Sequence, residues 1–547
     1  MRSWAGLAVT VHDAAAALLS GDGSLRAAAE ERFAGRKRCG GWPRQALAWL
    51  SQSAPEPRRI ALSWRPWAGL ARRVLGGGPA LRTPRARLLM AQAVAPLRLG
   101  RPVLWLPHHL CHAAAAFWTS PWQRAAILVV DAAGEGWTTW AGRGEGWRLE
   151  LLARTPFPHS LGFLYAGVTE HLGFAPDLEE GTVMGLAALG RPGEALRRAV
   201  SGLARTDGLE VRLDLAAFAH HRRLRPILSR EGASRLGPPR GPGDPLEQRH
   251  ADLAAALQRR TEEVLVALAR TLHRTTGLRA LCLGGGVALN APAVERIRRE
   301  SGFASVHVPP FPHDAGTAVG AALLLSAAEG GVDREALRAS LSFPGPRITR
   351  EDARRALRDA GLHWSEPRDP EAEVAVALAR GLVVARARGR AELGPRALGH
   401  RSLLCDPRHP HLRDRLNRMK GRQPFRPVAP VMTAAEARRF LDTGQMIRFM
   451  ERAVPVRPEA RAAIPAVVHA DGTARAQTVT REDHPDLHRL LQSFGRHTGI
   501  EVLGNTSFNL PGRPMVTGPR EAVRTAMELG VDLLDLAGLL VVLRIPE

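Results

Sequence analysis

Residues 6–32 read GLAVTVHDAAAALLSGDGSLRAAAEER, and residues 125–154, AAILVVDAAGEGWTTWAGRGEGWRLELLAR, repeat their plan. Each segment alternates short apolar runs with turns, a pattern typical of three successive strands. The motifs GDG and GRGEG supply the glycines that tight hairpin turns need. Asp13 and Asp131 each close the first apolar run, and each is followed by Ala-Ala. The repeat therefore predicts a duplicated α/β domain with acidic side chains at the ends of its first strands.

A strand-to-helix turn follows in LRALCLGGGVALN (278–290). The backbone amides of Gly285 and Gly286 could cradle phosphate or pack against adenosine, with Asn290 at the end of the turn. A tight turn explains the same glycines without any ligand. Together with the β-rich repeat, this pattern favours the α/β fold of the actin/hexokinase-like ATPases, in which two related subdomains close over a nucleotide.

A histidine cluster, LPHHLCHAAAAFW (106–118), begins a predicted helix. His108 and His112 are four residues apart, so a helix would project both from one face, where they could share a metal. The helix is otherwise apolar, which indicates burial, and Asp131 and Asp314 lie at element ends that the duplicated fold would turn toward its cleft. Two imidazoles with carboxylates suit Fe²⁺, Mn²⁺ or Zn²⁺. A chance pair on a solvated helix face is the alternative, since the chain has 20 histidines.

Of the 76 basic residues, only Lys37 and Lys420 are lysines. Lys carries a compact point charge and Arg a planar fork, so a position that stays Lys suggests a need for a small ammonium group. Lys420 lies in NRMKGRQPFRPVAP (417–430), between GRAELGPRALGHR (389–401) and GNTSFNLPG (504–512). These polar, Arg-rich stretches together predict an anion-binding site.

The formal net charge of +23 raises the question of a nucleic-acid partner. A general Arg bias explains it as well, and the basic stretch 72–89 contains no aromatic residue on which bases could stack. We therefore expect no nucleic-acid partner. We also expect no membrane span, because no run of about 18 apolar residues occurs, and no secretory signal. Four widely spaced cysteines predict neither a disulfide framework nor a zinc ribbon, which fits a reducing cytoplasm.

These motifs resemble those of the O-carbamoyltransferases of the NodU/CmcH type, a family that includes the carbamoyltransferase of tobramycin biosynthesis. The likeness covers nearly the whole chain. In the first half the matching stretches are HDAAAAL (12–18), EERF (30–33), HHLCHAAAAF (108–117), SLGFLYAGVTEHLGF (160–174), EEGTVMGLAALG (179–190), GGGVALN (284–290) and HDAGTAVGAA (313–322). In the second half they are GRAELGPRALGHRSLLCDPR (389–408), the Lys420 stretch, HADGTARAQTV (469–479) and GNTSFNLPGRPMV (504–516).

The resemblance implies an actin-like carbamoyl-transfer domain over residues 1–344 and a YrdC-like α/β domain over residues 345–547. A Pro-Gly-Pro break near residue 345 agrees with this boundary. The last run, VDLLDLAGLLVVLRIPE (531–547), reads as a closing helix and strand. In the family, the second domain makes carbamoyl adenylate from carbamoyl phosphate and ATP, and the first transfers the carbamoyl group to a hydroxyl with the help of an iron-type metal site.

The resemblance also implies roles for single residues. The metal ligands would be His108, His112, Asp131 and Asp314, with Fe²⁺ favoured and Mg²⁺ accompanying ATP. His12 would be the general base for the acceptor hydroxyl, and the catalytic cations would be Arg396, Lys420 and Arg426. The other substrate- and ATP-binding residues would be Arg475, Asn505, Ser507, Gly285, Gly286 and Asn290.

Six positions depart from the family pattern. Two of them lie in the second half, where Arg513 replaces a usual Glu and Gly504 replaces a bulkier apolar residue. Arg38 stands where His is expected, Thr182 where Lys is usual, Ala132 replaces a glycine, and Val294 replaces a frequent Asn. Most of these departures fall in the acceptor-facing domain, so they leave the acceptor open.

We expect an ATP-dependent O-carbamoyltransferase acting in the cytoplasm on a small-molecule hydroxyl, such as that of a sugar or a natural product. The alternatives are a tRNA-modifying enzyme of the threonylcarbamoyl type, whose substrate the positive charge would help to bind, and a non-catalytic nucleotide-binding regulator. A homodimer is one oligomeric state that the sequence leaves open.

Overall fold

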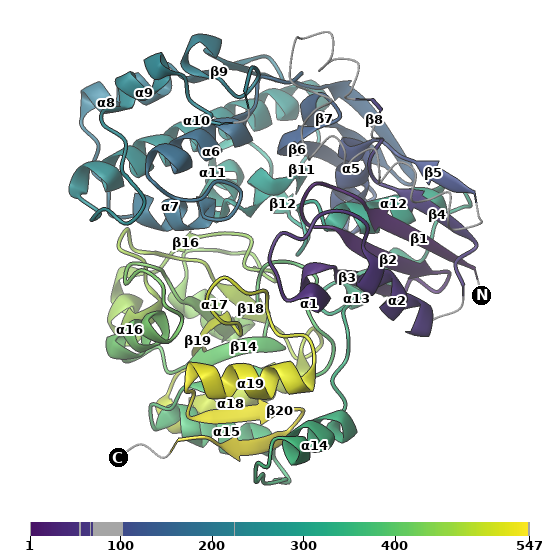
Figure 1. Ribbon diagram of the computed structural model, residues 1–547, viewed down its shortest axis with the longest axis vertical. Coiled ribbons are helices and arrows are strands. Elements are labelled where there is room, and N and C mark those ends of the chain that lie inside the picture. The colour runs from purple at the N-terminus through teal and green to yellow at the C-terminus, as the bar shows by residue number, and fades with distance from the viewer. Residues whose placement is uncertain (1, 54–55, 66, 69–101, 224, 545–547) are drawn as a thin grey trace. The chain divides into compact units, whose positions relative to one another are not determined.

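The computed structural model describes residues 2–53, 56–65, 67–68, 102–223 and 225–544 (Figure 1), and the basic stretch 72–89 lies outside them. The chain divides into two compact units: the first comprises Met1–Glu30 and Arg38–Leu341, and the second comprises Glu31–Lys37 and Ser342–Glu547. The expected domain over residues 1–344 included residues 31–37, whereas in the structure this short segment packs with the second unit.

The first unit contains two five-stranded sheets of the same topology, with strand orders β3-β2-β1-β4-β5 and β8-β7-β6-β11-β12. In each sheet the first three strands are antiparallel and the last two run parallel to the first. The strands are β1 (Ser3–Ala8), β2 (Ala15–Ser20), β3 (Leu25–Ala29), β4 (Arg59–Leu62), β5 (Val103–Trp105), β6 (Arg124–Gly134), β7 (Trp137–Glu145), β8 (Arg148–Ala153), β11 (Ala280–Gly284) and β12 (Ser305–His307). This repeat confirms the predicted duplicated α/β domain of the actin/hexokinase type.

Two alanine-rich helices, α5 (His108–Trp118) and α12 (Gly316–Ala327), pack against each other and against the sheets. Helix α5 follows the last strand of the first sheet but packs on β6, β7 and β11 of the second. Helix α12 follows the second sheet and packs on β1, β2 and β4 of the first. A Cβ atom at Gly320 would lie 1.8 Å from the carbonyl oxygen of Cys111, and one at Gly6 would lie 1.9 Å from that of Ala318. The small residues are therefore needed because backbones meet directly in this core.

The remaining helices of the first unit surround this core. Helix α10 has 29 residues and packs against α6, α7, α8 and α11. The helices are α2 (Arg44–Ser53), α6 (Leu161–His171), α7 (Glu180–Ala187), α8 (Glu194–Ser201), α9 (Arg230–Leu236), α10 (Gln248–Thr276), α11 (Ala291–Glu300) and α13 (Arg334–Ser340), with a short ribbon of β9 (Ala204–Asp207) and β10 (Glu210–Leu213).

The second unit is built on a mixed seven-stranded sheet with the order β18-β15-β19-β14-β13-β20-β21. Helix α15 packs on α18, and α14 packs on α19. The strands are β13 (Val384–Ala387), β14 (Arg401–Cys405), β15 (Ala429–Thr433), β18 (Gln477–Val479), β19 (Val502–Ser507), β20 (Leu533–Leu536) and β21 (Leu539–Val542). The helices are α1 (Glu31–Ala34), α14 (Arg350–Asp359), α15 (Pro370–Ala379), α16 (Pro410–Met419), α17 (Ala434–Phe440), α18 (Pro485–Thr498) and α19 (Pro519–Leu529). The unit is α/β, as predicted; its YrdC likeness stays a prediction.

The prediction of a closing helix and strand in residues 531–547 was wrong. Strands β20 and β21 form an antiparallel hairpin there. Its two loop residues, Ala537 and Gly538, have φ angles of 54° and 85°, and positive φ at both central positions is the turn geometry that matches the twist of paired strands. The Leu-rich pattern fits a strand as well as a helix, and pairing with β13 decided between them.

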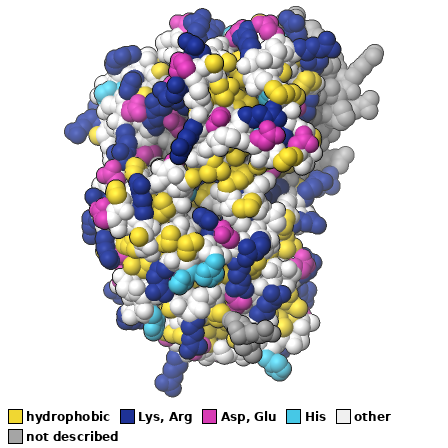
Figure 2. Space-filling model, turned by 90° about the vertical axis from the view of Figure 1, so that its left-hand side faces the viewer, with side chains coloured by type: hydrophobic (Ala, Val, Ile, Leu, Met, Phe, Trp, Pro, Cys, Tyr) yellow, Lys and Arg dark blue, Asp and Glu magenta, His cyan; other side chains and the backbone are white. Residues whose placement is uncertain are grey.

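Basic side chains are spread over the molecule. On the face that Figure 2 shows, Lys and Arg side chains are interspersed with acidic and hydrophobic ones and form no continuous patch. Among the described residues, no helix combines the length and apolarity that a bilayer crossing requires.

Candidate functional site

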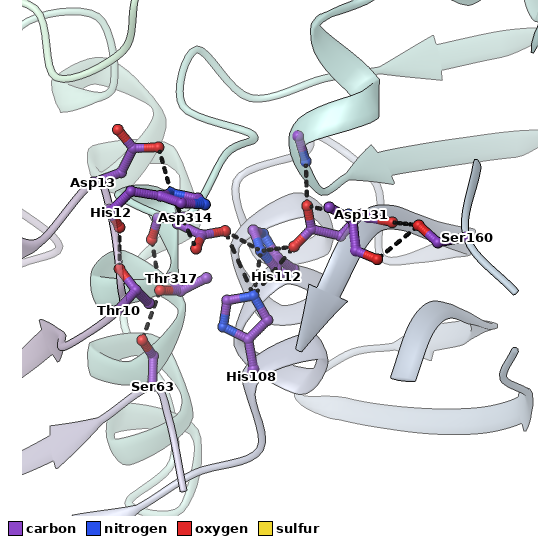
Figure 3. A network of polar contacts seen from close by, with 12 residues as sticks. Thr10, His12, Asp13, Ser63, His108, His112, Asp131, Ser160, Asp314 and Thr317 are labelled. Carbon is purple, nitrogen blue, oxygen red and sulfur yellow. Dashed lines mark hydrogen bonds and ion pairs between the residues drawn. The ribbon is translucent and has the colours of Figure 1, made fainter. Parts of the chain in front are cut away.

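Two side chains from α5 and two from strand and helix ends converge in the first unit (Figure 3). His108 and His112 lie in the first two turns of α5, Asp131 lies within β6, and Asp314 lies two residues before α12. One donor atom from each falls within 4.8 Å of the others, and all four residues are buried. The structure thus brings together the four predicted metal ligands, although they come from three separate parts of the chain.

The distances between the histidine nitrogens and the carboxylate oxygens of this set are close to those of atoms that share one ion. The two Nε2 atoms lie 3.2 Å apart. Asp131 Oδ2 lies 3.3 Å from His108 Nε2 and 3.6 Å from His112 Nε2, and Asp314 Oδ1 lies 3.5 and 3.4 Å from the same two atoms. Ligand atoms that each sit about 2.1 Å from a metal are about 3.0–3.4 Å from one another. Two imidazoles and two carboxylates at this spacing fit a divalent ion.

The charges of the set also favour a cation. Burial by itself would lower the pKa of His108, but Asp314 and Asp131 outweigh it and raise that pKa to about 10. Burial would raise the pKa of Asp131, whereas its hydrogen bonds to the two histidines hold it well below its usual range. The neighbouring His109, outside the ligand set, has its pKa lowered to about 3 by burial and by the charge of His108. Two ionised carboxylates therefore face two imidazoles in a water-poor site.

The backbone beside the cluster leaves room for its rings. A Cβ atom at Gly134 would lie 2.3 Å from Cδ2 of His108, so the glycine in DAAGEG gives this imidazole its place. Ser160 caps α6, accepting a hydrogen bond from Phe163 N, and donates to the carbonyl oxygen of Ala132 at 2.7 Å. The motif around Asp131 thus shapes the site through its backbone as well as through its carboxylate.

The predicted base, His12, lies next to Asp314. Its Nδ1 atom is 3.8 Å from Asp314 Oδ2 and 3.1 Å from Asp13 Oδ2. Arg38 donates to the same Asp13 oxygen at 2.7 Å. Burial would lower the pKa of His12, but its hydrogen bond to the Asp13 carboxylate and the charge of Asp314 raise it. The departure at Arg38 therefore acts on Asp13, which in turn holds His12.

Asp13 and Asp131 occupy equivalent places in the sequence repeat but have different partners in the structure. Asp131 joins the candidate ligands, while Asp13 pairs with His12 and Arg38 and has a φ of 58°. The sequence indicated an acidic residue at each strand end but did not indicate this division. The pairing of Asp13 was missed because it depends on Arg38, which is brought in by the chain that follows α1.

The glycine turn also meets the cluster. Gly286 N donates to Asp131 Oδ1 at 3.4 Å, and Gly285 has a φ of 85° in a place where a Cβ would lie 2.2 Å from the carbonyl oxygen of Val130. Asn290 caps α11, accepting from Ala293 N, and donates to Gln258. The turn lies beside the four candidate metal ligands, while the amide of Asn290 is already engaged in capping.

The other departures lie at different depths. Thr182 in α7 and Val294 in α11 are 1% and 2% exposed, so both belong to the core. Ala132 donates its backbone N–H to Asp131 Oδ1 at 2.8 Å. Arg38 and Ala132 touch the site directly, Arg38 through Asp13 and Ala132 through Asp131.

A cluster of cations gathers in the second unit. It comprises the predicted Arg396, Lys420, Arg426 and Arg475, together with Arg422 and Lys37. Lys420 is 6% exposed, and the arginines of the cluster are half-buried. The ammonium of Lys420 donates to the hydroxyl of Ser507 at 3.0 Å, to Asn509 Oδ1 at 2.8 Å and to the carbonyl oxygen of Ser507. A strand end and a helix end therefore meet at this lysine.

The cations of this cluster repel one another. Burial and the charges of Arg422, Lys37 and Arg426 hold the pKa of Lys420 well below its usual range. Burial and Arg426 lower the pKa of Arg422 to about 9 and that of Arg396 to about 10. Burial and the charges of Arg396, Arg426 and Arg422 hold the pKa of Arg475 well below its usual range. Such a concentration of like charge is the arrangement that a polyanion stabilises.

Several polar atoms in the cluster have no hydrogen-bond partner among the described residues. They include Nη2 of Arg422, Nε of Arg475 and Oδ1 of Asn505. The amide nitrogen of Asn505 donates to the carbonyl oxygen of Ala397, which fixes the side chain. Donors of this kind suit phosphate oxygens, and the acceptor Oδ1 suits an N–H group.

Helix α1 and the residues after it complete this cluster from a distant part of the chain. Arg32 is 3% exposed and donates to the carbonyl oxygens of Met515, Glu392 and Gly394 at 3.0–3.3 Å. Lys37, five residues on, is one of the charges that act on Lys420. The only two lysines of the chain therefore lie in one electrostatic cluster. Sequence reasoning missed Arg422, although it stands two residues from Lys420. It left Lys37 outside the predicted site, although the rarity of lysine marked that residue as well.

These features indicate a class of protein: a two-domain α/β enzyme with one centre fit for a divalent ion and another fit for anions. Residues 87–323 match the family model of the carbamoyltransferase N-terminus, and residues 375–542 match that of the carbamoyltransferase C-terminus. The chain belongs to the carbamoyltransferase family and is a carbamoyltransferase, which confirms the resemblance found in the sequence.

Relatives match over most of the chain. Nodulation protein NolO of Bradyrhizobium diazoefficiens is 33% identical over 78% of this chain and 76% of its own length. Nodulation protein NolNO of Sinorhizobium fredii is 35% identical over 79% of this chain and 62% of its own length. An uncharacterized protein of Synechocystis sp. is 36% identical over 80% of this chain and 75% of its own length. Among solved structures, HypF of T. kodakarensis gives a TM-score of 0.32 at 14% identity, covering 62% of this chain and 49% of that one.

Proposed function

We propose that this carbamoyltransferase is ATP-dependent and transfers a carbamoyl group through carbamoyl adenylate to a hydroxyl of a small molecule. Water must first take the phosphoryl group of carbamoyl phosphate, which leaves carbamate and free phosphate, before a carbamate oxygen attacks the α-phosphorus of ATP and expels pyrophosphate. One phosphate and one pyrophosphate therefore leave for each carbamoyl adenylate formed. The acceptor oxygen then attacks the carbamoyl carbon, its proton goes to a base, and AMP leaves.

The cation cluster of the second unit is the observation that carries this proposal. Two phosphate-bearing substrates bring several negative charges, and the like-charged neighbours of Lys420 are stabilised only when such charges are present. Arg396, Arg426 and Arg475 can hold phosphate oxygens through their guanidinium forks, while Lys420 supplies a point charge. The unpartnered Oδ1 of Asn505 can accept a hydrogen bond from the carbamoyl NH₂, a group that charge alone does not recognise.

The first unit supports the transfer step. His12 has a partly exposed side chain, held by Asp13, and its raised pKa suits a group that accepts a proton. His108, His112, Asp131 and Asp314 would hold a divalent ion, which we propose to be Fe²⁺. Such an ion, when bound, polarises a carbonyl oxygen or lowers the pKa of a bound hydroxyl. The glycine turn at Gly285 and Gly286 would approach the nucleotide, whose phosphates carry Mg²⁺.

A small molecule is the acceptor that we propose, a sugar or natural product hydroxyl being the chemical class. On the face that Figure 2 shows, basic side chains form no continuous track of the kind that tRNA would follow. A non-catalytic regulator would not need the buried donors that surround Lys420. We also propose a cytoplasmic location, because ATP is a cytoplasmic substrate.

The test is to incubate the purified protein with carbamoyl phosphate, labelled ATP, Fe²⁺ and Mg²⁺, and to measure phosphate and pyrophosphate release. We expect both products in equal amounts, and AMP only when a hydroxyl acceptor is added. Absence of pyrophosphate with both substrates and both metals present would overturn the proposal.

Two variants sharpen this test. Lys420→Met is expected to reduce pyrophosphate release at least about 100-fold, because a preorganised charge on the phosphates is lost. Arg418→Gln removes a positive charge from an exposed position in α16, the helix that ends just before Lys420, and is the matched control. We expect that control to keep nearly full activity. Equal losses in the two variants would show that charge in general, and not the Lys420 cluster, supports the reaction.

A further inference from the structure

A second cationic pocket lies in the second unit, apart from the Lys420 cluster. It opens to solvent and has a volume of about 430 Å³. One side is lined by residues 367–371, which lead into α15, and another by Ala537 and Gly538, which join β20 to β21. Its charged lining residues are Arg350, Arg368, Arg388 and Arg489, with Asp369 and Glu371. The lining therefore carries a net charge of +2, from four arginines less two carboxylates. None of the residues placed in the Lys420 cluster lines it.

Arg388 provides a rigid guanidinium at this pocket. The residue is 8% exposed, and Asp535 accepts from its Nε while Glu371 accepts from its Nη1 at 2.6 Å. Its Nη2 has no hydrogen-bond partner within the described part of the chain. A buried guanidinium with one unused nitrogen is costly, and an anionic oxygen in the pocket would satisfy it.

The other three arginines are exposed and lie at the rim. Arg350 and Arg489 have half or more of their side chains exposed. Each faces a carboxylate, Arg350 that of Glu366 at 3.5 Å and Arg489 that of Asp486 at 2.9 Å. Asp369 is occupied in capping helix α15, where it accepts from Ala372 N. A carboxylate thus already satisfies the N-terminus of that helix, so the groups left to bind an anionic ligand are the guanidinium groups.

We propose that this pocket binds a small phosphate monoester, with the dianionic phosphate against Arg388 and the rim arginines. The unpartnered Nη2 of Arg388 offers a donor to a phosphate oxygen, and the volume exceeds that of inorganic phosphate, which leaves room for a sugar or nucleoside. Guanidinium forks recognise phosphate oxygens in pairs, which four arginines around one pocket allow. The inference is independent of the proposed reaction, since no residue of that reaction lines the pocket.

The experiment uses AMP as probe on the full-length protein and hydrogen exchange as a local readout. We expect AMP to slow amide exchange in peptides covering residues 366–374 and 535–540. The pocket variant Arg350→Gln/Arg368→Gln/Arg489→Gln should weaken this protection at least about tenfold in AMP concentration, because three charged donors are lost. Absence of protection in the unaltered protein would overturn the proposal.

A matched control is available on the same unit. The variant Arg439→Gln/Arg520→Gln/Arg524→Gln removes three exposed arginines that also face carboxylates but do not line the pocket. It should retain AMP protection, and equal weakening in both variants would assign the effect to overall charge and overturn the site. Inorganic phosphate should protect the same peptides and adenosine should not; protection by adenosine alone would show that the base, and not the phosphate, is recognised. Pyrophosphate release by the pocket variant, measured separately, reports on the reaction and not on this pocket.

Discussion

Lys420 shows how one residue is constrained by its surroundings. Burial, and then the charges of Arg422, Lys37 and Arg426, hold the pKa of its ammonium well below the ordinary value of 10.5. In the unfolded chain Lys420 is protonated at pH values at which protonating it in the folded chain costs free energy. Below pH 10.5 this difference lowers the free energy of unfolding, and the penalty disappears as the pH rises to that value. The lysine is therefore kept at a cost to stability, as expected of a residue retained for binding.

The pH dependence of stability tests this account. Lys420→Met removes the titrating group and with it the penalty. The variant should therefore gain stability relative to the unaltered protein, and this gain in the free energy of unfolding should be larger at pH 7 than at pH 10. Urea unfolding at the two pH values measures the difference. The Arg418→Gln variant should show no such change between the two values, and a Lys420→Met difference that is constant with pH would contradict the lowered pKa.

The metal-ligand set makes a second prediction for single residues. His108→Ala removes one of four converging donors, so metal affinity should fall at least about 100-fold. Metal content after dialysis, measured by elemental analysis, checks this. His109 is the neighbouring control, since its imidazole is buried beside the set but outside it. Retention of full metal content by His108→Ala, or its loss in His109→Gln alone, would show that the ligands are other residues.

Helices α5 and α12 carry the site at the scale of elements. Helix α5 supplies both histidines, and the residues that lead into α12 supply Asp314, so the distance between donors depends on how closely the two helices pack. The backbones approach at Gly320, where a Cβ atom would lie 1.8 Å from the carbonyl oxygen of Cys111. Backbone atoms cannot move aside as a flexible side chain can.

Gly320→Ala should therefore destabilise the protein by about 3 kcal/mol or more, because the helices must separate. Gly181→Ala is the contrasting change: Gly181 lies in helix α7, and a Cβ there meets nothing within 4 Å. That substitution should stabilise by up to about 1 kcal/mol through helix propensity. Denaturant unfolding measures both, and metal content should fall only in Gly320→Ala. If Gly320→Ala were as stable as the unaltered protein, the close packing of the two helices would be contradicted.

At the scale of the whole molecule, the large positive charge affects the stability of the folded state. The chain carries a formal net charge of +23, and self-repulsion of this size opposes the compact state. Chloride should raise the melting temperature by screening. Pyrophosphate should raise it further at equal ionic strength, because it binds the folded Lys420 cluster; at about 100 times its Kd the added stability is about 2.7 kcal/mol. The extra gain should vanish in a Lys420→Met/Arg475→Met variant, and its persistence there would place the bound anion elsewhere.

Short-range patterns in the sequence determined much of the fold and of the candidate site. The repeat at 6–32 and 125–154 predicted six strands of the first unit, since alternation and turn glycines act over a few residues. The spacing of His108 and His112 placed both on one helix face for the same reason. The sequence also indicated the stretches around Lys420 whose cations gather in the second unit, because a rare lysine among arginines is visible without any structure.

Tertiary packing alone decided which distant residues meet. It brought Asp131 and Asp314 to the two histidines, joined residues 31–37 to the second unit, and gave Asp13 a different partner from Asp131. It also turned the last Leu-rich run into a hairpin by pairing β20 with β13. Contacts between positions hundreds of residues apart depend on the burial of whole faces and not on local preference, so a single sequence could predict the residues of the site more readily than their arrangement.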